Sequence, residues 1–306
     1  MHVGIDVAKE HLDWAQGAQG AVKRVSNNPR AIRQLVQDLA RLAPERIILE
    51  STGGYERPLL YALAEARLPA VLVNPWRVRR FGEGLGILAK TDSIDARLLA
   101  RFGEVSELAP TIVPTLAKRA AAELIARRRQ LIGMIVAEKQ RLQRATVAVR
   151  REIAGLVKIL QRRIAQLDTQ IDADIQHDAE RQQTQAILLS APSVGPGVAR
   201  TLLIDLPELG ALSRRQIASL VGLAPFPRDS GNKIGLRRVR DGRASVRTAL
   251  YLAAMNGARF NPILKDLYRR LRAAGKPPKL AFVALARKLL TILNAMVRDR
   301  TVWQCA

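Results

Sequence analysis

The chain has 306 residues, of which 50 are Lys or Arg and 27 are Asp or Glu, so its formal net charge is +23. That length predicts about two domains, and the apolar fraction of 48% excludes a wholly disordered chain. Lys279, Arg287 and Lys288 interrupt the longest apolar stretch, so no membrane span is expected. One Cys and three scattered His exclude a disulfide framework and a cysteine-ligated zinc site. The start lacks a signal-peptide profile, and we expect a cytoplasmic protein.

Residues 1–110 have the pattern of an α/β domain. Strands are predicted at 2–7, 11–16, 21–25, 46–50 and 71–73, and helices from residue 28 to about 39, over 55–66 and from about residue 91. Three early strands followed by alternating helices and strands predict an α/β sandwich with a mixed sheet.

Residues 111–185 begin after a proline-marked boundary and carry apolar residues at steps of three and four. The two series are Leu124, Leu131, Ile135 and Leu142, and then Ile153, Leu156, Leu160, Ile164, Leu167 and Ile171. This spacing predicts a coiled-coil helical hairpin, with its bend expected within 149–155. Such a hairpin either dimerises or braces another domain, and a plain intramolecular helix pair is an equal alternative.

Residues 186–306 read as a mainly helical third domain, with helices predicted at 244–258 and 279–297. The segment 192–199 resembles a helix-hairpin-helix turn, in which Gly195 and Gly197 free backbone N–H groups to approach a phosphate. The alternative is an ordinary glycine-rich connection between helices.

The positive charge is concentrated toward the C-terminus. Residues 1–110 have a net charge of +2, residues 111–185 of +6 and residues 186–306 of +15. A basic surface gains affinity for DNA or RNA by releasing counterions. Arginine suits phosphates and unpaired bases, so we expect nucleic-acid contacts from the basic residues of 228–247, against the alternative of a solvated loop. These residues are Arg228, Lys233, Arg237, Arg238, Arg240, Arg243 and Arg247.

Two tryptophans are further candidates for contact with bases. Trp76 and Trp303 could stack on nucleotides, although a core position is the stronger expectation for Trp76.

Four carboxylates of the first domain are candidates for a metal site. Asp6 and Glu50 end predicted strands, and Asp92 and Asp95 share one face of a helix start. Grouped carboxylates repel one another unless Mg²⁺ or Mn²⁺ lies between them, and such ions activate phosphodiester transfer. Each residue taken alone has a structural alternative, such as a turn cap or a helix-dipole contact.

Six segments resemble the DEDD transposases of insertion-sequence family one-ten, its eleven-eleven branch and the Piv-type DNA invertases. They are GIDVAKEHLD, ILESTGGYERPLLYALAEA, VNPWRVRRFGEGLGILAKTDSIDARLLARF, SVGPGVARTLL, LVGLAPFPRDSGNKIG and GRASVRTALYLAAMNGARFNP. The resemblance implies a RuvC-like, RNase H-type domain at 1–110, with the acidic tetrad at Asp6, Glu50, Asp92 and Asp95. It implies a coiled-coil middle at 111–185 and a transposase domain at 186–306.

The resemblance also implies a nucleophilic serine at Ser245. From the residues alone Ser230 is an equal candidate, and Tyr251 is a third that we interpret as a packing residue. A serine hydroxyl needs activation and charge stabilisation. No His lies near Ser245 in the sequence, so the expected activator is a divalent metal held by the first domain.

The function implied is a transposase that recombines donor and target double-stranded DNA through a covalent phosphoserine. The resemblance adds a structured non-coding (bridge) RNA as guide and a homodimer that assembles into a tetramer. One rival is a metal-dependent nuclease or Holliday-junction resolvase without a covalent intermediate. The other is a non-catalytic nucleic-acid-binding protein.

Overall fold

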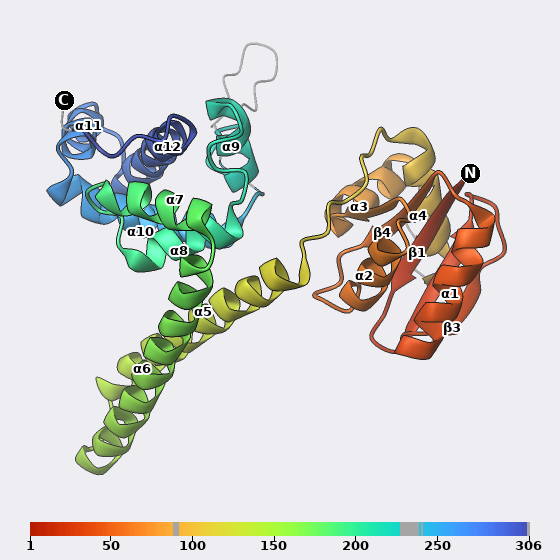
Figure 1. Cartoon of the computed structure of the whole chain (residues 1–306), viewed down its shortest axis with the longest axis horizontal. Coiled ribbons are helices and arrows are strands. Elements are labelled where there is room, and N and C mark those ends of the chain that lie inside the picture. The colour runs from red at the N-terminus through yellow and green to blue at the C-terminus, as the bar shows by residue number, and fades with distance from the viewer. Residues whose placement is uncertain (88–91, 227–238, 240, 305–306) are drawn as a thin grey trace. The chain divides into compact units, whose positions relative to one another are not determined.

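A computed structural model describes residues 1–87, 92–226, 239 and 241–304, apart from the side chains of Asp92 and Ser93. The chain divides into two compact units, Met1–Pro114 and Thr115–Ala306 (Figure 1). The first unit contains β1 (His2–Val7), β2 (His11–Gln16), β3 (Lys23–Ser26), α1 (Pro29–Leu42), β4 (Arg46–Glu50), α2 (Arg57–Glu65), β5 (Ala70–Val73), α3 (Pro75–Gly84) and α4 (Asp92–Val105).

The strands form a mixed sheet in the order β3-β2-β1-β4-β5. β1, β2 and β3 pair antiparallel, whereas β4 and β5 continue the sheet parallel to β1. The predicted α/β sandwich is therefore confirmed, although β3 begins two residues later than expected.

Helices cover both faces of this sheet. On one face, Ile5 and Leu49 belong to an apolar core shared with α1 and α2. On the other face, Ile48 and Val73 pack with α3 and α4. Since successive strand residues point to opposite faces, β4 contributes Leu49 to the first core and Ile48 to the second.

Close packing places α4 directly on β1. A Cβ atom at Gly4 would overlap the backbone of Ala96 and Ala100, and one at Gly103 would lie 2.6 Å from Ile48. Gly4 therefore faces the middle of α4, and Gly103, near the end of α4, lies beside His2 at the start of β1. The helix consequently runs opposite to β1, and its first turn lies at the strand's carboxyl end.

The second unit is helical in its described part. It contains α5 (Leu116–Leu142), α6 (Val147–Gln176), α7 (Ala179–Ser190), α8 (Pro196–Asp205), α9 (Arg214–Val221), α10 (Ala244–Phe260), α11 (Pro262–Ala273) and α12 (Pro278–Arg298).

α5 and α6 form the expected antiparallel hairpin (Figure 1). Its buried seam includes Leu131, Ile153, Leu160 and Ile171. The predicted bend is wrong: the chain turns at 143–146, and 149–155 lies inside α6. The glycine in that predicted bend, Gly155, is compatible with a helix interior at a cost of about 1 kcal/mol relative to Ala.

A ladder of charged side chains ties the hairpin to α8. Arg200 of α8 is only 7% exposed and donates to both carboxylate oxygens of Asp172, at 2.7 and 2.6 Å. Arg200 also pairs with Asp168 at 2.8 Å, and Asp168 accepts hydrogen bonds from Arg128 of α5. The hydrogen bonds from Arg200 hold the pKa of Asp172 below its ordinary value.

α12 is the central helix of the remaining bundle. Leu285, Leu289, Leu290 and Leu293 are fully buried in a core shared with α7 to α11. Among the described residues, α12 is long and apolar enough to cross a membrane by length and composition. Its buried leucines form this core, which accounts for much of that composition.

We expect Gly4→Ala to destabilise the first unit by about 1–3 kcal/mol, because the new methyl group must push α4 away from β1. Guanidinium denaturation of the whole chain measures this loss. Gly133→Ala in α5 is the matched control, since open space surrounds Gly133, and it should stabilise by up to about 1 kcal/mol. Equal stability of Gly4→Ala and the wild type would contradict this packing.

Candidate functional site

Asp6 and Glu50 lie side by side at the carboxyl ends of two parallel strands. Ile5 pairs with Leu49, so one further step of the same register sets Asp6 beside Glu50. Ile5 and Leu49 point to the α1–α2 face, and strand alternation directs Asp6 and Glu50 to the face covered by α4. Both residues are half-buried.

The first turn of α4 adds two acidic positions on this face of the sheet. Positions 92 and 95 share a helix face with Ala96 and Leu99, which contact Gly4 of β1. The side chain of Asp92 is outside the described residues. Within the described part of the chain, no three His, Cys, Asp or Glu side chains form a metal-sized group. Asp6 and Glu50 nevertheless offer the carboxylate oxygens that Mg²⁺ and Mn²⁺ prefer.

Sequence reasoning missed a third carboxylate beside Asp6. Asp13 of β2 lies directly opposite Asp6 in the antiparallel register and is 2% exposed. Arg24 of β3 donates to both of its oxygens, at 2.8 and 2.6 Å, and thereby neutralises the buried charge. The sequence does show an acidic residue, Asp13, inside a predicted strand. It does not show the strand register that places Asp13 opposite Asp6.

Glu56 organises the turn that follows Glu50, and it was also missed. Its carboxylate is 6% exposed and accepts hydrogen bonds from the N–H groups of Thr52 and Gly54, at 3.0 and 2.8 Å. Burial raises the pKa of Glu56, but hydrogen bonds from the backbone of Glu56, Thr52 and Gly54 and from the Thr52 hydroxyl together lower it more, so the pKa lies below its ordinary value. The turn in the motif ESTGGYE is therefore built around an ionised glutamate.

Ser245 is the second residue of α10 and is half-buried. Arg243, the N-cap residue, donates to the backbone oxygen of Asp205 at 3.0 Å and to both oxygens of Glu208, one at 2.6 Å. Burial raises the pKa of Glu208, but Arg243 and a backbone hydrogen bond at Glu208 together lower it more, so the pKa lies below its ordinary value. Arg243 thus fixes the start of α10, and its contact with phosphate stays a prediction.

Arg247 is similarly engaged on the other side of Ser245. Its guanidinium donates to the backbone oxygen of Val221 at 3.2 Å and to that of Asp241. Gly222 and Gly242 allow this, because both have positive φ and their backbones touch where any Cβ would overlap. The segment that carries Ser245 is consequently held on both sides by arginine.

The remaining predicted site residues are placed as follows. Gly195 is the exposed N-cap of α8, and Gly197 lies beside the guanidinium of Arg128. Tyr251 packs edge-on against Phe282, as expected. Outside the described residues lie Arg228, Ser230, Lys233, Arg237, Arg238 and Arg240. The core position expected for Trp76 is wrong, because its side chain is 49% exposed.

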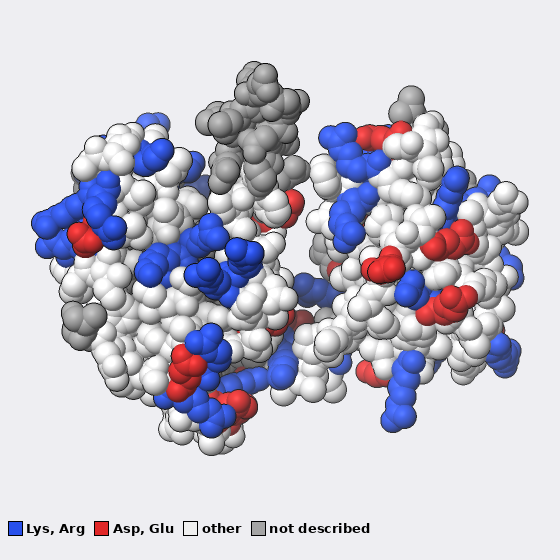
Figure 2. All heavy atoms as spheres, turned by 90° about the horizontal axis from the view of Figure 1, so that it is seen from above, with Lys and Arg blue, Asp and Glu red and all other residues white. Residues whose placement is uncertain are grey.

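Charge is distributed differently on the two units. On the face shown in Figure 2, both signs intermingle on the first unit, whereas Lys and Arg dominate the helical unit. This agrees with net charges of +2 for residues 1–114 and +21 for residues 115–306.

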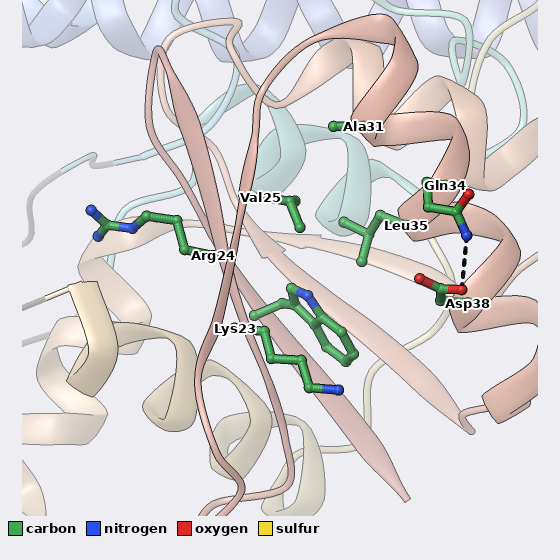
Figure 3. Close-up of a pocket in the computed structure, with 8 residues that line it drawn as sticks. Lys23, Arg24, Val25, Ala31, Gln34, Leu35 and Asp38 are labelled. Carbon is green, nitrogen blue, oxygen red and sulfur yellow. Dashed lines mark hydrogen bonds between the residues drawn. The ribbon is translucent and has the colours of Figure 1, made fainter.

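A hollow of about 320 Å³ opens on the other side of the sheet. Figure 3 shows it between α1 and the strands β2 and β3, with Trp14, Lys23, Leu35 and Asp38 in its lining. It belongs to the α1 face, away from the face to which Asp6 and Glu50 point.

We expect Glu56→Gln to lower the free energy of unfolding by about 1–3 kcal/mol at pH 7, because the turn loses its charged acceptor. A lowered folded-state pKa contributes stability above the unfolded value, about pH 4.3, and that stability is lost as the pH falls through the folded pKa. The difference from wild type should therefore shrink below about pH 4.3 in denaturation at several pH values. Exposed Glu65→Gln is the control, and a pH-independent difference for Glu56→Gln would refute the ionised turn.

We expect Arg243→Met to cost about 1–3 kcal/mol, because it leaves the half-buried Glu208 without its partner. The double variant with Glu208→Gln should lose less than the sum of the two single losses, with a coupling of about 1 kcal/mol. Denaturant unfolding of the four proteins measures this cycle. The exposed pair Asp266–Arg270 provides the control cycle and should couple by only about 0.3–0.5 kcal/mol. Strict additivity at Arg243 and Glu208 would contradict the structure.

Comparison with known proteins finds two family matches. A DEDD transposase model of the IS110 type matches residues 3–148, and the model of the transposase IS116/IS110/IS902 family matches residues 185–269. The first range includes all four acidic positions, and the second includes Ser245.

Individual relatives agree with these matches. The chain is 27% identical to the pilin gene-inverting protein of Moraxella bovis, over 97% of this chain and 96% of that protein. It is 32% identical to an uncharacterized 42 kDa protein of insertion element IS900 from Mycobacterium paratuberculosis, over 59% of this chain and 47% of that protein. A solved structure of T. thermophilus RuvC in complex with a Holliday junction substrate is 17% identical, with a TM-score of 0.27, and covers 36% of this chain and 99% of that one.

These matches follow the division seen in the fold. The first unit is a RuvC-like mixed-sheet domain, and the second contains a mostly helical transposase domain. The chain therefore belongs to the IS110/IS116/IS900 family of DEDD transposases, which cleave and rejoin DNA strands, and it is related to the pilin gene-inverting proteins.

Proposed function

We propose that this transposase breaks and rejoins DNA through a covalent bond between Ser245 and a DNA phosphate. The observation that carries the proposal is the rigid start of α10, where Arg243 and Arg247 hold the segment on either side of Ser245. In the proposed step the Oγ–phosphorus bond forms while a phosphorus–oxygen bond to deoxyribose breaks. The serine loses its proton, and the departing sugar oxygen gains one. Attack by a sugar hydroxyl reverses the step and rejoins the strand.

The carboxylate edge of the first unit is the proposed second site. Asp6, Glu50, Asp92 and Asp95 would hold Mg²⁺ or Mn²⁺, which DEDD RuvC-like nucleases typically use. A divalent ion there would stabilise charge that develops on the reacting phosphate oxygens. Asp13, already neutralised by Arg24, would leave the charge of Asp6 available to the ion.

The partners are donor and target double-stranded DNA, and we extend the proposal to a structured non-coding RNA that supplies sequence choice. The excess positive charge of residues 115–306 suits contacts with nucleic-acid backbones of either kind. A homodimer that assembles into a tetramer would present several copies of both sites to the two DNA duplexes.

The test combines purified protein, Mg²⁺, donor and target DNA and candidate flanking RNA, with products separated on a denaturing gel. The wild type should give a covalent protein–DNA adduct, and both Ser245→Ala and Asp6→Ala should abolish it, because each removes one of the two proposed sites. Ser219→Ala, in α9, is the matched control and should retain the adduct. Cleavage without an adduct that survives Ser245→Ala would instead identify a hydrolytic nuclease or junction resolvase.

A further inference from the structure

Trp76 stands at the same edge of the sheet as Asp6 and Glu50. Glu50 pairs with Val73 in the parallel register, and the N–H group of Ser51 donates to the oxygen of Val73 at 3.1 Å. Asn74 then caps α3 by accepting a hydrogen bond from the N–H group of Trp76 at 2.9 Å. The backbone of Trp76 is therefore fixed three residues beyond the strand position beside Glu50.

The fold does not use the indole ring of Trp76 as core. α3 buries Val78 against the sheet and Gly82 against Leu98 of α4, whereas Trp76 remains 49% exposed. By contrast, Trp14 is 5% exposed and Trp303 packs against the core of the second unit. Tyr55, in the turn after β4, is also about half exposed at 48%. Two large aromatic side chains are therefore accessible on the segments that follow β4 and β5, Tyr55 in a turn and Trp76 in the first turn of α3.

The surroundings of Trp76 are basic. The Arg80 guanidinium lies 5.4 Å from the centre of the indole ring, and Arg77 is exposed on the same helix. Glu83 pairs with both Arg79 and Arg80, at 3.7 and 2.9 Å, so the helix keeps a net charge of +2. An accessible aromatic ring on a helix with a net positive charge matches a nucleotide, which combines a flat base with a phosphate.

We propose that Trp76 stacks against an unpaired base of the DNA strand that lies along the carboxylate edge, while Arg77 and Arg80 contact its backbone. The inference rests on the proposed function only in placing DNA at that edge. Stacking on an aromatic ring tolerates any base, because every base has a π-face. Trp76 would thus hold a strand locally unpaired beside Asp6 and Glu50 without selecting its sequence.

The test measures binding of the full chain, in EDTA and at low salt, to a fluorescein-labelled forked duplex with an unpaired thymidine flap. Fluorescence anisotropy of Trp76→Ala should show about a tenfold loss of affinity for the fork and no change for the fully paired duplex. Trp76→Phe should retain most of the affinity, because it keeps an aromatic face. A fork whose flap is abasic should reduce wild-type binding to the level of Trp76→Ala. Leu85→Ala, at the other end of α3, is the matched control and should bind as the wild type does.

Two results would overturn the assignment. One is unchanged affinity of Trp76→Ala for the fork. If that variant also loses self-association in sedimentation, Trp76 makes a protein contact instead. The other is an equal loss on the fork and the paired duplex. Thermal melting of each variant excludes unfolding as the cause. The assay measures binding in EDTA without strand cleavage, so a failure of the serine mechanism leaves this result intact.

Discussion

The contact between β1 and α4 is the constraint on which the candidate site depends. Two glycines, Gly4 and Gly103, bring the helix backbone onto the sheet, where side chains would otherwise separate them. Strand alternation then directs Asp6 toward this helix, and antiparallel packing sets the first turn of α4 beside it. The acidic positions come together because the backbones of β1 and α4 approach so closely. Asp6 and Glu50 lie at the ends of their strands, where the first turn of α4 begins.

Most of the first unit could be predicted from the sequence because its strands and helices are marked by strong local signals. Alternating apolar residues, Asn-Pro caps and strand-ending acids gave the element order, and they placed Asp6 and Glu50 at strand ends. Register is a non-local property, so the neighbour of Asp6 on β2, Asp13, remained invisible. Exposure is also non-local. A tryptophan such as Trp76 is expected in the core, and only the position of α3 on the sheet shows that Val78 is buried and Trp76 is not.

The arginines show why composition alone misleads about binding. Arg200 is buried against two aspartates. Arg243 and Arg247, at the start of α10, donate hydrogen bonds to Glu208 and to the backbone oxygen of Val221. Each of these guanidinium groups has several donors in a fixed plane, which suits backbone carbonyls and carboxylates as well as phosphates. The net charge of the second unit still favours nucleic acid, but fewer arginines are available for contact than the sequence suggests.

The ion pairs among Arg128, Asp168, Arg200 and Asp172 lie where the hairpin meets α8. They attach the hairpin to the helical bundle at the end opposite its turn. Its far end, the turn at 143–146, joins the two helices of the α5–α6 seam. Adding one heptad to each helix near that turn would lengthen the hairpin by about 10 Å, because it would extend the apolar seam and leave the ion pairs with α8 in place. The number of heptads therefore sets the length of the α5–α6 hairpin, and that length can change while the residues of the two proposed sites stay the same.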